Sequence, residues 1–196
     1  MTMDRRTTIY LVRHAESAPS PEVPEPDWPL SARGVAQAEA LVPALRGLGA
    51  RAIYASPYRR AIATVEPFAA ALGLTVSAVD ALRERSLGGM FADADLPAIF
   101  QRCWAEPAFA PPGGESNAAC AQRVAAALAE LAARHPGEAI VAASHGNALT
   151  LFLGTLDASI GIAYWRAMRN PDLFCVVYDG DRPTWDGARL PVAIAP

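Results

Sequence analysis

Five side chains that could carry out polar chemistry follow closely on predicted β-strands. They are Arg13 and His14 after residues 7–12, Arg60 after 52–55, Glu84 after 74–79 and His145 after 139–143. Each of these segments is a short apolar run, as expected of strands buried on both faces. In a parallel sheet, ligands bind beyond the carboxyl ends of the strands. The sequence therefore predicts that these side chains surround one site.

This set of residue types suits phosphoryl transfer. A guanidinium group matches a tetrahedral oxyanion through two parallel hydrogen bonds, which Arg13 and Arg60 could supply. A histidine held through one ring nitrogen by a backbone carbonyl presents the other nitrogen as a nucleophile. A second histidine, if protonated, could donate to phosphoryl oxygens, and Glu84 could protonate the leaving alkoxide and then deprotonate water. Together these roles describe transfer through a phosphohistidine.

Each histidine taken alone also has a structural interpretation. A single histidine after a strand is more often structural than catalytic. The third histidine, His135, stands at a predicted helix end, where stabilisation by the helix dipole accounts for it. The coincidence of two histidines, two arginine-bearing strand ends and a glutamate favours function over chance.

Helices are predicted between these strands. Their residues are 32–47, 57–72, 95–104, 117–134, 147–154 and 158–167, and a last strand covers 174–178. Ser31 and Ser116 are typical N-cap residues, and Pro57 suits the first helical position. Strands that alternate with helices and lack polar alternation indicate a largely parallel α/β sheet. The Pro-rich segment 18–30 is expected to form a loop, and 86–115 a less regular lid.

Length and composition narrow the class of protein. At 196 residues the chain is expected to form one domain, residues 1–196, and 52% hydrophobic residues are enough for a sizeable core. The formal net charge is −3, so no nucleic-acid partner is expected. All 17 basic residues are Arg. Without Lys there is no Walker A phosphate loop and no Schiff-base chemistry.

Metal sites, disulfides and membranes are not indicated either. Cys103, Cys120 and Cys175 are odd in number and show no C-x-x-C spacing, and no Asp, His and Cys cluster suggests a metal site. No apolar run reaches the ~18 residues of a membrane span, and no signal peptide is recognisable. We therefore expect a cytoplasmic protein with no metal, no cofactor and no membrane partner. A homodimer is one possible assembly.

Six short motifs occur in an order that is typical of one protein family. They are LVRHAES at 11–17, PLSARG at 29–34, SPYRRA at 56–61, LRER at 82–85, PGGES at 112–116 and ASHG at 143–146. In these motifs the chain resembles the histidine phosphatase superfamily, the phosphoglycerate mutase-like proteins, over nearly its whole length. The resemblance implies a three-layer α/β/α sandwich with a mostly parallel central sheet.

The resemblance also implies a role for each matched side chain. His14 would be the phosphorylated nucleophile and Glu84 the proton donor. Arg13, Arg60 and His145 would bind the phosphoryl group. These are the roles that the chemistry of the residue types already suggests.

Neighbouring motif positions carry weaker expectations. Arg59 is expected at the surface, Glu16 in a local structural role, and Glu115 in a first helical turn, where a carboxylate stabilises the helix dipole. Ser20 stands where the mutase-like pattern has Asn, so one phosphate donor is lost or moved. Secondary candidates for the site are Ser20, Arg85 and Gly146.

Three functions fit these residues. The most direct is a metal-independent phosphomonoester hydrolase acting on a small phosphorylated metabolite through a phosphohistidine on His14. The alternatives are a phosphoglycerate mutase-type phosphotransferase and a non-catalytic phosphate-binding module. The short region 86–112, with Arg102 as its one basic residue, favours the phosphatase, whereas Arg83 and Arg85 could anchor the second anion of a mutase substrate. Five aromatic residues could form a partly apolar mouth: Trp28, Phe91, Phe100, Trp104 and Phe109.

Overall fold

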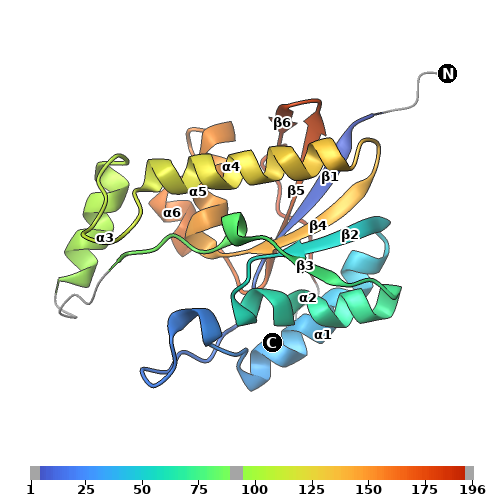
Figure 1. Ribbon diagram of the computed structural model, residues 1–196, viewed down its shortest axis with the longest axis horizontal. Helices are drawn as coiled ribbons and strands as arrows, with labels where there is room; N and C mark the ends of the chain where they lie inside the picture. The colour runs from blue at the N-terminus through green and yellow to red at the C-terminus, as the bar shows by residue number, and fades with distance from the viewer. Residues whose placement is uncertain (1–4, 89–94, 193–196) are drawn as a thin grey trace.

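The computed structural model describes residues 5–88 and 95–192 (Figure 1). The strands are β1 (Thr7–Arg13), β2 (Ala50–Ala55), β3 (Val76–Ala78), β4 (Ala139–Ser144), β5 (Asp172–Asp179) and β6 (Arg182–Thr184). The α-helices are α1 (Ala32–Arg46), α2 (Arg59–Leu72), α3 (Leu96–Ala105), α4 (Asn117–Arg134), α5 (Gly146–Leu156) and α6 (Ile162–Arg166). Two 3₁₀ helices, η1 (Glu25–Asp27) and η2 (Asp80–Leu82), lie in the connecting loops.

All six strands form one sheet in the order β3-β2-β4-β1-β5-β6. The strands β3, β2, β4 and β1 run parallel, whereas β5 is antiparallel to β1 and β6 is antiparallel to β5. Helices α1 and α2 cover one face of the sheet, and α4 and α5 cover the other (Figure 1). The predicted three-layer α/β/α sandwich with a mostly parallel sheet is therefore confirmed.

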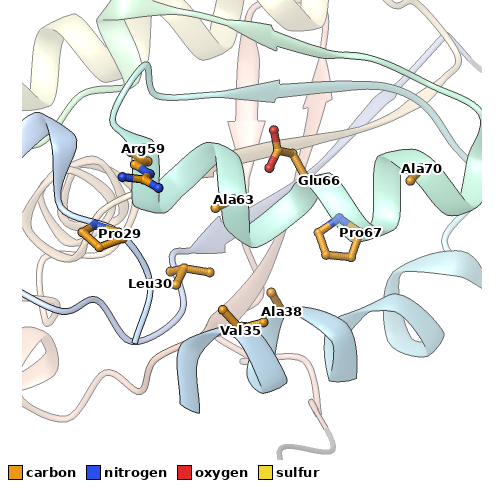
Figure 2. A pocket seen from close by; sticks show the side chains of 9 residues that line it. All are labelled: Pro29, Leu30, Val35, Ala38, Arg59, Ala63, Glu66, Pro67 and Ala70. Atoms are coloured by element: carbon orange, nitrogen blue, oxygen red, sulfur yellow. The ribbon is translucent and has the colours of Figure 1, made fainter. Parts of the chain in front are cut away.

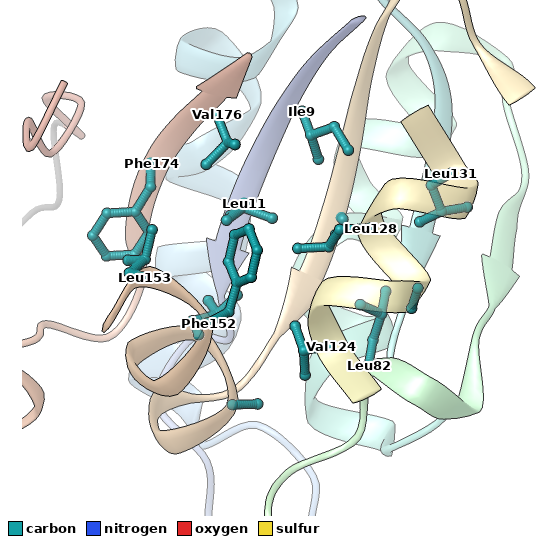
Figure 3. Close-up of a cluster of buried hydrophobic side chains, with 14 of the residues drawn as sticks. Ile9, Leu11, Leu82, Val124, Leu128, Leu131, Phe152, Leu153, Phe174 and Val176 are labelled. Carbon is teal, nitrogen blue, oxygen red and sulfur yellow. The ribbon is translucent and has the colours of Figure 1, made fainter. Parts of the chain in front are cut away.

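Alternation along the strands gives each face its own core. On β1, Ile9 and Leu11 pack toward α4 and α5, whereas Val12 belongs to the cluster under α1 and α2. Figure 3 shows Ile9 and Leu11 lying among Leu128 of α4 and Phe152 of α5. All of these side chains are fully buried, and burial of each contributes about 1.5–3 kcal/mol. Helices thus pack against both faces of the central strands, and this packing fixes the positions of the strand ends.

The helices that follow β1 and β4 set the carboxyl ends of these two strands apart from the rest of the sheet. The strand β1 leads to α1 on one face, and its neighbour β4 leads to α5 on the opposite face. Adjacent parallel strands whose following helices lie on opposite faces leave a crevice at their carboxyl ends. The predicted site residues that follow β1 and β4 stand at this crevice.

Some element boundaries differ from the prediction for local reasons. Helix α2 begins at Arg59 rather than at Pro57, because the backbone N–H of Tyr58 donates to Ser56 Oγ (3.2 Å) and keeps the chain extended. The helix predicted at 158–167 is reduced to α6, which starts after an extended Gly161. Strand β6 is missing from the prediction because three residues are too few for a periodic pattern.

Candidate active site

Strand pairing brings the two histidines to the same place. Arg13, the last residue of β1, pairs with Ser144, the last residue of β4, and His14 N–H donates to Ser144 O (3.0 Å). The next residues, His14 and His145, therefore emerge side by side, with ring centroids 5.2 Å apart. The prediction that strand ends deliver these side chains to one site agrees with this geometry.

The His14 ring is oriented and kept neutral. Its Nδ1 lies 2.7 Å from Ala15 O, so Nδ1 carries the proton and donates to this carbonyl. Its Nε2 accepts a hydrogen bond from Arg60 Nε (3.2 Å). Burial lowers the His14 pKa to about 3, and the charges of Arg60 and Arg13 act in the same direction. The unprotonated Nε2 consequently has a lone pair directed at the Arg60 guanidinium, where a phosphoryl group would bind.

The ring of His145 is fully buried, and only one of its two nitrogens is hydrogen-bonded within the described residues. Nε2 lies 2.8 Å from Ser56 Oγ, and Nδ1 has no hydrogen-bond partner in the part of the chain that the structure describes. Burial lowers the pKa of His145 well below its ordinary value, and nearby His14 and Arg60 lower it further. This shift favours a neutral ring, which can still donate one N–H, so the expected donor role does not require a protonated His145.

Arg13 is anchored by the loop that follows α6. Its Nη1 donates to Met168 O (2.9 Å), while Nε is buried and unpartnered among residues 5–88 and 95–192. Gly146 makes room for this side chain, because a Cβ at Gly146 would lie 3.2 Å from Arg13 Nε and 3.0 Å from Trp165 Nε1. The secondary candidate Gly146 thus acts by close packing against Arg13.

Arg60 is the most enclosed cation of the site. The residue is 3% exposed, and its guanidinium carbon lies 4.9 Å from the Tyr58 ring centroid and 5.6 Å from that of Trp28. Nη1 donates to Glu25 O and Nη2 to Glu25 Oε1, both at 2.8 Å. Arg59, the neighbouring residue, is exposed, as expected from the sequence.

Glu84 is held at the start of α5. Its Oε2 accepts from Asn147 N (3.0 Å), and its Oε1 accepts from Ala148 N (2.9 Å) and Arg85 N (2.8 Å). Ser144 Oγ donates to Leu82 O (2.7 Å), which ties the Glu84 segment to the end of β4. The carboxyl group is thereby fixed beside His145 and Gly146, the residues that precede Asn147.

A half-buried ion pair supports the Glu84 segment. Arg123 Nε and Nη2 donate to the two carboxylate oxygens of Glu115 at 2.7 and 2.6 Å. Arg123 Nη1 also donates to Ala81 O (2.8 Å) and Arg83 O (3.1 Å), on either side of Leu82. The expectation that Glu115 mainly serves the helix dipole is replaced by this bidentate pair. Ser116, by contrast, is the N-cap of α4, and its Oγ accepts from Ala119 N (3.1 Å).

The other two secondary candidates lie differently. Ser20 Oγ accepts from Glu22 N (3.2 Å), within its own loop, and makes no contact with His14. Arg85 is 4% exposed, and its Nε and Nη1 have no partner among the described residues. Its guanidinium carbon lies 5.5 Å from the Phe100 ring centroid, and the Phe100 ring is 4.8 Å from that of Trp165. Since Trp165 also packs at Gly146, Arg85 is placed on the Arg13 side of the site.

Two of the site's positioning residues could not be assigned from sequence. Thr64 Oγ1 accepts from Ala15 N (2.9 Å) and donates to Arg60 O (2.7 Å), so it joins the His14 and Arg60 segments. Asn170 Nδ2 donates to His14 O (2.8 Å) across 156 residues of chain. Thr64 lies three residues after the SPYRRA motif, and this proximity was a signal of its importance, but nothing in the sequence points to Asn170. Glu16, as expected, has a local role, accepting from Ser31 Oγ (2.6 Å).

Two cavities are distinct from these residues, since neither His14, Glu84 nor His145 lines them. A groove of about 540 Å³ runs between α1 and α2, and Figure 2 shows that mainly apolar side chains line it, with Arg59 and Glu66 as the charged members. A cleft of about 330 Å³ is lined by Phe100, Trp165 and Arg166 among others, and adjoins the site through Trp165. Of the predicted aromatic mouth, Trp28 and Phe100 lie near the site, whereas Phe91 falls outside the described residues.

Two structural searches give negative results within residues 5–88 and 95–192. No group of three or more His, Cys, Asp and Glu side chains is arranged so as to hold a metal ion. No helix in these ranges combines the length and the apolar character needed to cross a bilayer.

Comparisons with known proteins agree on one family. The model of the histidine phosphatase superfamily (branch 1) matches residues 9–189. The probable phosphoglycerate mutase GpmB of Salmonella paratyphi C is 30% identical over 171 residues, covering 82% of this chain and 78% of that one. The structure of mycobacterial glucosyl-3-phosphoglycerate phosphatase superposes with a TM-score of 0.76 at 25% identity, covering 98% and 100% of the two chains. YhfR of Bacillus stearothermophilus gives 0.75 at 27% identity and 96% coverage of each chain.

Proposed function

The chain belongs to the histidine phosphatase superfamily (branch 1), and on this premise we propose that it is a metal-independent phosphomonoester hydrolase. The observation that carries the proposal is the neutral His14 ring, with Nδ1 bound to Ala15 O and Nε2 facing Arg60. A nucleophile needs a free lone pair, and burial keeps this one unprotonated. The substrate is a small phosphorylated metabolite.

The first step transfers the phosphoryl group to the enzyme. His14 Nε2 attacks phosphorus, the bond from phosphorus to the ester oxygen breaks, and Glu84 gives its proton to the leaving oxygen. Arg13, Arg60 and the free N–H of His145 bind the equatorial oxygens. Catalysis here rests mainly on positioning and on charge stabilisation in a buried site.

The second step releases phosphate. The Glu84 carboxylate takes a proton from a water molecule, whose oxygen attacks the phosphorus of phosphohistidine. The bond from Nε2 to phosphorus breaks and inorganic phosphate forms. Glu84 is then protonated again and His14 neutral, so both return to their starting states.

Phosphoglycerate mutase-type transfer is the second candidate. It uses the same phosphohistidine but returns the phosphoryl group to the organic substrate. One observation favours it: Arg85 is buried without a partner near the site and could bind the carboxylate of such a substrate. The names of the relatives include both a probable mutase and a phosphatase of a phosphoglycerate ester.

The test measures phosphate release from an aryl phosphate in excess chelator. We expect chelator-resistant turnover by the native protein and a loss of roughly 10³-fold or more in His14→Ala, because the covalent route is removed. His135→Ala, which changes the histidine at the opposite end of the sheet, is the matched control and retains its activity. Full activity in His14→Ala would refute the proposal. Interconversion of 3- and 2-phosphoglycerate faster than phosphate release would replace it by the mutase.

A further inference from the structure

Each nitrogen of the Arg60 guanidinium already donates one hydrogen bond in this structure. Nη1 donates to Glu25 O (2.8 Å), Nη2 to Glu25 Oε1 (2.8 Å) and Nε to His14 Nε2 (3.2 Å). Nε and Nη2 form one side of the guanidinium plane, the side through which an arginine binds a carboxylate or phosphate with two parallel bonds. One of the two nitrogens on this side, Nη2, is therefore already bound to the Glu25 carboxylate.

The two partners of this ion pair differ in their freedom to move. The Arg60 side chain is 4% exposed and lies against Tyr58 and Trp28, whereas the Glu25 side chain is 45% exposed. Arg60 is also fixed through its own backbone, because Arg60 O accepts from Thr64 Oγ1 (2.7 Å). If the pair opens, the Glu25 carboxylate moves into solvent and Arg60 stays in place.

A phosphoryl group on His14 would meet the Glu25 carboxylate at Arg60. Its oxygens would approach Nε and Nη2 of Arg60, and the carboxylate already bound to Nη2 would be a like-charged neighbour. Like charges this close repel each other, although solvent at the 45% exposed Glu25 side chain weakens the repulsion. The phosphoryl oxygens and the carboxylate therefore compete for Arg60.

We propose that Glu25 is a built-in competitor for the phosphoryl group, a residue that sets how tightly the site holds phosphate. The proposal rests on the proposed function in one respect, that the ligand of Arg60 is a phosphoryl group. Because the site is open to phosphate only when Glu25 has moved away, the observed affinity equals the intrinsic affinity times the fraction of open molecules.

This competition has a consequence for product inhibition. Glu25 weakens the binding of every phosphate ligand by the same factor, so the affinity of an ester relative to inorganic phosphate is unchanged. The concentration of inorganic phosphate needed to occupy the site is raised by that factor. An ester gains further binding from contacts of its leaving group, for example in the cleft beside Phe100 and Trp165.

The chain provides a matched pair of variants. Glu25→Gln removes the competing charge but keeps the side-chain shape, and the bond from Nη1 to the backbone carbonyl of residue 25 is unaffected. Glu22→Gln makes the same charge change in the same loop, and the Glu22 carboxylate has no partner in the ranges 5–88 and 95–192. A general effect of loop charge would appear in both variants, and competition for Arg60 in the first alone.

The experiment is calorimetric titration of the native protein and both variants with inorganic phosphate and with orthovanadate, together with kinetics on an aryl phosphate. We expect Glu25→Gln to bind both anions roughly three- to tenfold more tightly and to lower KM by a similar factor. Glu22→Gln should stay within about twofold of the native protein, an effect typical of an exposed charge.

Each other outcome overturns the proposal in a distinguishable way. Unchanged or weaker anion binding by Glu25→Gln would show that Glu25 positions Arg60 instead of competing for it. An equal gain in Glu22→Gln would show a general charge effect. If the native protein bound neither anion and released no phosphate, the proposed function itself would fail, and the inference with it.

Discussion

The two ends of strand β4 carry histidines in opposite circumstances. His135 precedes the strand, and both of its ring nitrogens have partners, Tyr54 Oη at 2.8 Å and Glu138 Oε2 at 2.7 Å. His145 follows the strand, is fully buried, and leaves Nδ1 without a partner in the described part of the chain. Histidine thus has all its hydrogen-bond partners at the amino end of β4, whereas at the carboxyl end one ring nitrogen has none among the described residues.

The difference shows where buried polar groups without partners lower the stability of the fold. A buried polar group without a partner destabilises a fold by about 1–3 kcal/mol. At the carboxyl end of the sheet such groups accumulate, since Arg13 Nε and two Arg85 nitrogens share this state with His145. A ligand with several acceptor oxygens would satisfy them together. At the amino end the His135 network is satisfied and stabilises the fold, and Tyr178 Oη, which lies where β5 pairs with Thr7, is the buried group without a partner among the described residues.

The largest expected effect on the reaction rate comes from replacing the carboxylate at the carboxyl end of the sheet, with the carboxylate at the amino end as the control. Glu84→Gln removes the proposed proton donor to the leaving oxygen, so single-turnover transfer from an alkyl phosphate should slow by roughly 10²–10⁴-fold. An aryl phosphate, whose leaving group needs less protonation, should lose at least tenfold less. Glu138→Gln, at the amino end, is the control and should change neither rate by more than about twofold. Equal losses for both substrates in Glu84→Gln would contradict the role in proton donation.

A somewhat smaller effect separates the two histidines. His145→Ala removes the donor to a phosphoryl oxygen and should lower kcat/KM by roughly 10²–10³-fold. His135→Ala should leave kcat/KM nearly unchanged but lower the free energy of unfolding by about 1–2 kcal/mol, because two hydrogen bonds of a half-buried ring are lost. Steady-state kinetics and urea unfolding of both variants measure the two effects. A large decrease of kcat/KM in His135→Ala would contradict the different roles of the two histidines.

The assembly of the carboxyl end could largely be predicted from the sequence, for a simple physical reason. Parallel strands bring their last residues to one edge, so the apolar runs before Arg13 and His145 were enough to place the two side chains together. The alternation of strands and helices indicated the largely parallel sheet, and the family resemblance implied the three layers. The apolar runs in β1 and β4 correctly indicated burial on both faces, whereas β3 at the edge of the sheet is largely exposed.

Other features depend on information that no local pattern contains. The contact of Glu25 with Arg60 depends on the path of a Pro-rich loop, which has no periodicity to interpret. The bond from Asn170 to His14 joins distant parts of the chain and depends on how β5 enters the sheet. The lowered pKa of His145 could not be predicted, because it is set mainly by the depth of burial, which the sequence does not give. Local patterns thus place the side chains, while tertiary packing sets their charge states.

The smallest expected effect concerns the free energy of unfolding at low pH, which should depend on His14 at the carboxyl end of the sheet. The His14 pKa is about 3 in the folded protein and 6.5 in the unfolded chain, so below pH 6.5 the unfolded chain binds a proton that the folded protein does not. The stabilisation is complete above that pH and is lost as the pH falls from 6.5 towards 3. By about pH 5 the loss due to His14 should be about 2 kcal/mol. We therefore expect His14→Gln to lose about 2 kcal/mol less than the native protein between about pH 7.5 and about pH 5, as measured by urea unfolding. His145 remains in both proteins, so the difference isolates His14, and equal losses would mean that His14 is not held neutral by burial.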